Sequence, residues 1–188
     1  MFLLIAVVVA VALVPILHGD LGALAGMRVR LAGLLLIALL IQVLVVAVFP
    51  GPASGVRLSL FLASYPLGVA FLYLNRRLSG LWLVGVGAVL NLLAIVANAG
   101  VMPATAGALA TAGVPAGGDV FANSASVADP RLWFLGDVFA IPSSVPLANV
   151  FSVGDVLIAL GVGWTIVRAS RGAPGQPMRQ TGSGTPEG

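Results

Sequence analysis

One acidic side chain stands out because it lies at the head of a long apolar segment. Asp155 follows Ser152-Val-Gly and precedes an apolar run that ends at Arg168. Ionisable groups within such segments are costly in lipid and often mark catalytic, ion-binding or proton-carrying positions. Asp155 therefore has two functional interpretations, a catalytic carboxylate or a ligand for an ion or proton.

The same residues also fit a purely structural interpretation. Ser152 and Asp155 have the spacing of a capping box, in which each side chain accepts a hydrogen bond from the backbone amide of the other. A carboxylate at this position also favours the positive end of the helix dipole. The spacing therefore predicts that Asp155 caps a helix, whether or not it has a chemical role.

Other polar residues interrupt the apolar segments, namely Gln42, Asn91 and Asn98. Asn91 and Asn98 are seven residues apart, so they share one face of a helix. That helix should run outward, which would bring Asn98 to the outer rim, where it could meet Asp155. Together with Ser152, the two asparagines form the predicted polar cluster. Such a cluster could line the path of a small transporter subunit.

The composition sets the class of protein. The chain is 60% hydrophobic and only 8% charged, which is too few charges to cover the surface of a soluble domain. It has no cysteine and one histidine, His18, so we expect no cofactor and no metal site. Its arginines are scattered singly or in pairs, which argues against a nucleic-acid-binding patch. We predict an all-α, polytopic transmembrane bundle.

Apolar periodicity and breakers divide the chain into about five spans with one long polar loop. The first run is predicted to be a retained helix, because no positive residue precedes it; a cleaved signal peptide ending near Ala23-Leu-Ala25 is the alternative. We expect a single membrane domain, residues 1–171, and a disordered cytoplasmic tail, residues 172–188. The predicted spans are residues 2–17, 31–49, 58–74, 78–97 and 151–167.

Arginine placement predicts the orientation. Seven arginines flank the spans on one side and two lie on the other. The richer side should be cytoplasmic, which places the N-terminus outside, the C-terminus inside and the loop 104–148 outside. The seven are Arg28, Arg30, Arg76, Arg77, Arg168, Arg171 and Arg179, and the two are Arg57 and Arg131.

The outer loop has its own local signals. Residues 104–112 predict a short helix, with Gly113 as a left-handed cap. Arg131-Leu-Trp-Phe-Leu135 is an aromatic patch suited to the outer headgroup level. The loop is predicted to be a lid packed on the bundle, with a docking surface for a partner or lipid as the alternative.

Glycine and alanine are frequent within the spans, at Gly85, Gly87 and Gly161 among others. Small residues allow helices to pack closely in lipid. They should serve packing within the bundle, or alternatively self-association between copies.

Three motifs carry a resemblance to a known family: Asn98-Ala-Gly-Val-Met-Pro103, Arg131-Leu-Trp-Phe-Leu-Gly-Asp137 and Phe151-Ser-Val-Gly-Asp155-Val-Leu-Ile158. Together they resemble an uncharacterised family of bacterial multi-pass membrane proteins, catalogued only as a domain of unknown function. The resemblance covers most of the chain. It implies an integral protein of the bacterial plasma membrane and brings no activity with it.

A second, local resemblance concerns Phe151-Ser-Val-Gly-Asp155. It is similar to the start of the last span in lipoprotein signal peptidases, with Ser152 where those enzymes have asparagine. In that family a second catalytic aspartate lies shortly upstream, and Asp137 matches its placement. The resemblance implies that Asp137 and Asp155 could share a proton and activate water.

These observations give one leading hypothesis and two alternatives for function. The leading hypothesis is a non-enzymatic accessory or structural membrane protein, whose expected partners are the lipid bilayer and either another membrane protein or a second copy of the chain. The alternatives are an aspartyl peptidase-like hydrolase using Asp137 and Asp155, and a small transporter subunit.

Overall fold

The computed structural model describes residues 2–48, 55–114, 124–125 and 129–172. These residues are mostly helical, with seven α-helices, one 3₁₀ helix and four short strands. In chain order the elements are α1 (Phe2–Ile16), α2 (Leu21–Ala25), α3 (Ala32–Val48), α4 (Gly55–Leu74), α5 (Leu81–Ala97), β1 (Met102–Pro103), α6 (Ala106–Thr111), β2 (Ser124–Ala125), η1 (Trp133–Leu135), β3 (Phe139–Ile141), β4 (Asn149–Phe151) and α7 (Val153–Ser170).

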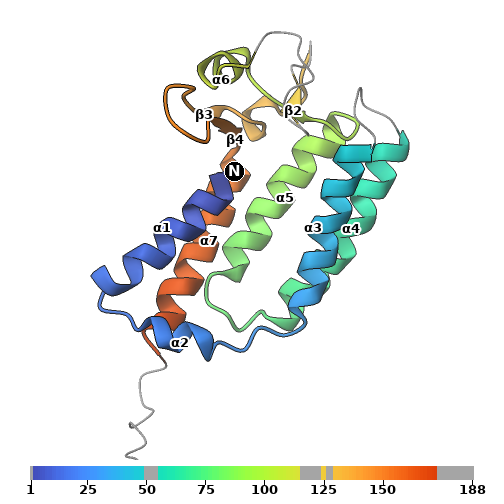
Figure 1. The fold of residues 1–188 in the computed structure, drawn as a ribbon. Coiled ribbons are helices and arrows are strands. Elements are labelled where there is room, and N and C mark those ends of the chain that lie inside the picture. The colour runs from blue at the N-terminus through green and yellow to red at the C-terminus, as the bar shows by residue number, and fades with distance from the viewer. Residues whose placement is uncertain (1, 49–54, 115–123, 126–128, 173–188) are drawn as a thin grey trace, which may run out of the picture.

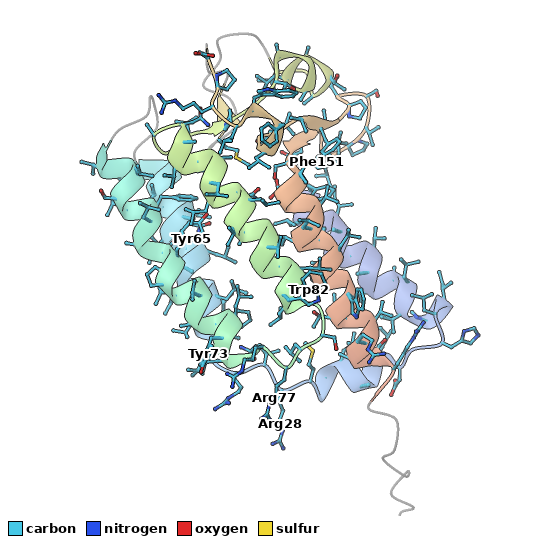
Figure 2. All side chains as sticks on the ribbon, turned by 180° about the vertical axis from the view of Figure 1, so that it is seen from behind. Arg28, Tyr65, Tyr73, Arg77, Trp82 and Phe151 are labelled. Atoms are coloured by element: carbon cyan, nitrogen blue, oxygen red, sulfur yellow. The ribbon has the colours of Figure 1, made fainter. Side chains whose placement is uncertain are left out.

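The five long helices α1, α3, α4, α5 and α7 lie side by side (Figure 1). Their directions alternate along the chain, so that the neighbours α1 and α7 run the same way. Helix α7 packs between α1 and α5, and α3 pairs with α4. The elements between α5 and α7 cover one end of the bundle, which we call the cap end. The opposite end carries Arg28 and Arg77 and is called the arginine end (Figure 2).

These five helices occupy the positions of the five predicted spans, with small differences at their ends. By length and composition, α7 alone among the described helices clearly satisfies the criteria for a membrane span. The apolar helical stretches in the other four are 10–17 residues long. The structure therefore establishes a mostly helical protein in which one described helix, α7, is both long and apolar enough to cross a membrane.

Two helices begin later in the chain than predicted. Helix α5 begins at Leu81, not Leu78, because the amide of Leu78 donates to the carbonyl of Asn75 in a turn. Helix α7 begins after Ser152, because Phe151 belongs to strand β4. Helix α2 was not predicted; Asp20 caps its N-terminus by accepting from the amide of Gly22.

The closest helix packing joins α5 to α7 through paired glycines. A Cβ atom built on Gly161 would lie 2.7 Å from the carbonyl oxygen of Gly80, and one built on Gly154 would lie 2.6 Å from that of Gly87. Both distances are too short for a real side chain, so the two backbones touch directly. Gly87 and Gly161 thus serve packing within the bundle, as predicted. A Cβ built on Gly85 would instead lie 3.5 Å from the Leu72 side chain of α4, which is an ordinary contact.

Helices α3 and α4 form a hairpin with a polar contact at its centre. The side-chain amide of Gln42 donates to the hydroxyl of Ser64 at 2.9 Å, and Ser64 donates to the carbonyl of Phe61 at 2.7 Å. The hairpin joins the rest of the bundle near the cap end through a buried apolar cluster. That cluster contains Phe61, Ala94, Ile95 and Met102, with Tyr65 and Leu135 packed against it.

The described residues between α5 and α7 form the cap. Strands β3 and β4 pair antiparallel, with Ala140 opposite Val150, and β1 pairs in parallel with β2. Helix α6 confirms the predicted short helix, and Gly113 follows it with a φ of 76°. The cap has its own small apolar core, made by Ala104, Ala108, Leu109, Ala112, Val114 and Val150.

Two sequence predictions concern segments outside the described residues. The tail predicted to be disordered is described only at Gly172. Within the predicted outer loop, residues 115–123 and 126–128 lie outside the described residues.

The glycine contacts predict a sharp difference between two alanine substitutions on α7. Gly161→Ala would force its new methyl group against the backbone of α5, and such overpacking costs about 1–3 kcal/mol. Gly163→Ala is the matched control, because its Cβ would lie 3.7 Å from Ala10, an ordinary contact. Unfolding of the purified protein by dodecyl sulfate in detergent micelles would measure both. Equal free energies of unfolding for the two variants would contradict the close α5–α7 contact.

Candidate functional site

Asp155 lies in the predicted capping box at the start of α7. The hydroxyl of Ser152 accepts from the amide of Asp155 at 3.0 Å, and the Asp155 carboxylate accepts from the amide of Ser152 at 3.1 Å. Ser152 is fully buried, and Asp155 is half-buried. The capping interpretation of Asp155 is therefore confirmed.

Asn91 of α5 extends the capping box into a ring between two helices. Its side-chain amide nitrogen donates to the carboxylate of Asp155 at 2.9 Å. Its amide oxygen accepts from the hydroxyl of Ser152 at 2.8 Å. Four hydrogen bonds thus connect three residues, Asn91, Ser152 and Asp155, which we call the α5–α7 ring.

The ring gives both oxygens of the Asp155 carboxylate and the Ser152 hydroxyl a structural role. Each carboxylate oxygen of Asp155 accepts a hydrogen bond, and the Ser152 hydroxyl both donates and accepts. More broadly, every buried side-chain nitrogen and oxygen among the described residues has a hydrogen-bond partner. As it stands, the ring's geometry fastens α5 to α7.

The ring depends on the adjacent glycine contact. A side chain on Gly154 would collide with the amide of Asn91. Gly154 therefore allows Asn91 to reach the start of α7, and Gly87 allows the two helices to approach on the same side. The polar ring and the glycine pairs form one continuous interface.

Asn98 serves a different contact from the one predicted. Its side chain pairs with the main chain of Arg131, donating to the carbonyl at 2.8 Å and accepting from the amide at 3.0 Å. It also donates to the carbonyl of Ala94 at 2.7 Å. Asn91, seven residues earlier on the same face of α5, is the residue that reaches Asp155. Asn98 instead anchors the cap through the main chain of Arg131.

Asp137 lies within the cap, just before β3, and is 4% exposed. Its amide donates to the carbonyl of Pro103 at 2.8 Å, and its carbonyl accepts from the amide of Thr105 at 3.1 Å. These main-chain bonds join the segment before β3 to the end of β1 and to Thr105, which follows it. A catalytic pairing of Asp137 with Asp155 stays a prediction.

Gln42 belongs to a separate polar contact. It bonds Ser64 between α3 and α4, whereas Asn91 and Asp155 meet between α5 and α7. The path proposed for a transporter subunit would have to connect these two contacts.

Sequence reasoning missed Asn75, which lies at the arginine end and is 4% exposed. Its side chain pairs with the main chain of Arg30, accepting from the amide at 2.8 Å and donating to the carbonyl at 2.9 Å. It resembles the Asn98 contact at the other end of the bundle. The available signal was an asparagine directly after an apolar helix at both positions.

A double-mutant cycle would measure the α5–α7 ring. We expect Asn91→Ala and Ser152→Ala to be coupled by about 0.6–1.7 kcal/mol, the average and maximum found for hydrogen bonds between membrane helices. The control pair is Asn91→Ala with Ser59→Ala, because the Ser59 hydroxyl bonds only within its own helix, to Gly55. The free energy of unfolding in detergent gives the coupling energy. Equal coupling in both cycles would rule out the ring.

Comparison with known proteins supplies a family and no activity. No curated protein and no solved structure matches the chain. A family model described as "Family of unknown function (DUF5317)" matches residues 26–167, which include all three residues of the α5–α7 ring. Because this match covers most of the sequence, the chain belongs to that family of unknown function.

Proposed function

We propose that the chain is an integral membrane protein with five spans and a non-enzymatic, structural or accessory role. The observation that carries the proposal is the apolar outer surface of all five long helices. Soluble monomers rarely expose contiguous apolar patches larger than a few hundred Å². One example from each helix, between 53% and 65% exposed, is Leu4, Leu36, Val69, Val89 and Leu160.

The distribution of charge supports the same proposal. Charged side chains lie near the helix ends, as at Asp155 in the first turn of α7 and Arg168 in its last. The arginine end contains Arg28 and Arg77 (Figure 2). An excess of arginine marks the cytoplasmic side of a membrane protein. We therefore propose that the arginine end is cytoplasmic and that the cap faces outward from a bacterial plasma membrane.

The aromatic patch of the cap fits this orientation. Trp133 and Phe134 pack edge to face with ring centroids 6.1 Å apart, and both are more than half exposed. Tryptophan prefers the level of the lipid headgroups. The patch would anchor the cap at the outer membrane interface.

The hydrogen bonds made by Gln42 and Asp155 favour an accessory role over the two alternatives. A hydrolase would use the Asp155 carboxylate to activate water, whereas the hydrogen bonds that its oxygens accept from Asn91 and Ser152 serve helix capping and helix packing. A transporter would need a polar path, and Gln42 and Asp155 belong to separate contacts. We therefore propose that the polar residues hold the bundle together and present the cap to a membrane partner.

Alkaline carbonate extraction and reporter fusions would test the membrane proposal. We expect the protein to stay in the membrane pellet after carbonate treatment. A fluorescent reporter at the C-terminus should be active, and a phosphatase reporter there should be inactive, because the phosphatase folds only outside the cytoplasm. A phosphatase inserted after Gly113 in the cap should be active. Release by carbonate, or the opposite reporter pattern, would refute the proposal.

Asp155→Asn and Asp137→Asn would separate the accessory role from the hydrolase. In a strain lacking the gene, we expect both variants to restore whatever growth or envelope defect the deletion causes. Asp155→Asn should lower the free energy of unfolding by about 0.5–1.5 kcal/mol, the net contribution of one hydrogen bond, because one of the two carboxylate oxygens that accept hydrogen bonds becomes an NH₂ group. Loss of complementation by both variants at normal protein abundance would favour the hydrolase.

A further inference from the structure

An open apolar groove of about 550 Å³ lies between α4 and α5. This volume is in the range of ligand-binding pockets, roughly 300–1,000 Å³. Helices α4 and α5 are joined by the buried cluster around Phe61 and Ala94, toward the cap end, so the groove occupies the half nearer the arginine end. Its lining residues are Val69, Leu72, Tyr73, Arg76, Leu81, Trp82, Gly85, Val86, Val89 and Leu90.

Gly85 contributes to the depth of the groove. The only atom within 4 Å of a Cβ built there is the Leu72 side chain, at 3.5 Å. A larger side chain at this position would therefore enter the groove without striking a backbone. The rest of the lining is apolar except at one end.

The polar end of the groove carries a single positive charge, Arg76, which follows the last turn of α4. The Arg76 guanidinium lies 4.4 Å from the centre of the Tyr73 ring and donates to the Tyr73 carbonyl at 3.1 Å. These contacts hold the cation over the mouth of the groove, and its remaining N–H groups can bind an anion. Tyr73 and Trp82 are both more than 60% exposed beside it, at a level suited to lipid headgroups.

The length of the groove matches one leaflet of a bilayer. From Leu81 to Leu90 the lining spans nine helical steps, or about 13 Å at 1.5 Å per residue. Half of a hydrocarbon core of about 30 Å is about 15 Å. An apolar chain lying in the groove would thus reach from the arginine end to about the middle of the membrane.

We propose that this groove binds an anionic phospholipid of the cytoplasmic leaflet. The phosphate pairs with Arg76, and one acyl chain lies between α4 and α5 over Gly85. Basic pockets between membrane helices on the cytoplasmic side are suited to anionic headgroups. This inference rests on the proposed function, because it requires the arginine end to face the inner leaflet.

Quenching of tryptophan fluorescence by brominated lipids would test the site directly. Trp82 borders the groove, and Trp164 is half exposed on α7, outside the groove lining. Two reporter proteins would be reconstituted in phosphatidylcholine vesicles: Trp133→Phe/Trp164→Phe, which retains Trp82, and Trp82→Phe/Trp133→Phe, which retains Trp164. Dibrominated phosphatidylglycerol or dibrominated phosphatidylcholine is then added in increasing fractions.

From the quenching of Trp82, we expect the groove to bind phosphatidylglycerol about fivefold more tightly than phosphatidylcholine. This ratio corresponds to roughly 1 kcal/mol per arginine at an anionic lipid surface. Trp164 should show a smaller preference or none. Adding Arg76→Gln to the Trp82 reporter should abolish the preference, whereas Arg77→Gln, an exposed neighbour outside the lining, should largely preserve it. Adding Gly85→Leu should abolish it with all arginines in place, because the groove is filled.

Three results would overturn the site. Equal lipid preference at Trp82 and Trp164, or equal losses from Arg76→Gln and Arg77→Gln, would leave only diffuse attraction between charges. Protection of Trp82 from both brominated lipids would show that a second copy of the chain occupies the groove. Carbonate extraction keeps this test separate from the membrane proposal, since a carbonate-resistant protein without lipid preference refutes only the lipid site.

Discussion

Direct backbone contact between α5 and α7 is the constraint on which the rest of the structure depends. Gly80 and Gly87 on one helix meet Gly161 and Gly154 on the other, so no side chain separates the two helices. In lipid, where apolar burial gives helices little reason to associate, such packing is a main source of stability. Helix α1 then packs on the other side of α7, and the cap lies across the ends of α5 and α7.

The polar ring is a consequence of this contact. Asn91 can reach both Ser152 and Asp155 only because Gly154 leaves the space that a side chain would fill. A charged residue that looked functional in isolation therefore has a structural explanation in its surroundings. Among the described residues, the glycines of α3 and α4 (Gly33, Gly55 and Gly68) have no atom of another element within 4 Å of a built Cβ, and the apolar groove lies between α4 and α5.

The sequence predicted the elements that depend on local signals. Apolar length located the five long helices, and the spacing of Ser152 and Asp155 predicted the capping box. Gly113 correctly marked the end of the short helix in the cap. What could not be predicted depends on distant segments meeting: Asn91 was known to share a face with Asn98, but only the crossing of α5 and α7 decides which of them reaches Asp155. The short strands were also missed, because their two- and three-residue pairings depend on partners elsewhere in the cap.

Asn75 and Asn98 hold the main chains of Arg30 and Arg131, and neither bond involves the arginine side chain. Each asparagine binds the main-chain N–H and C=O of one residue, and every residue has these groups except proline, which lacks the N–H. The charge at these two positions is therefore uncoupled from the bond that secures the loop. Mutation could add, remove or exchange charge at either end of the bundle while the architecture stays fixed; in the proposed membrane arrangement, such changes would tune the orientation of the bundle.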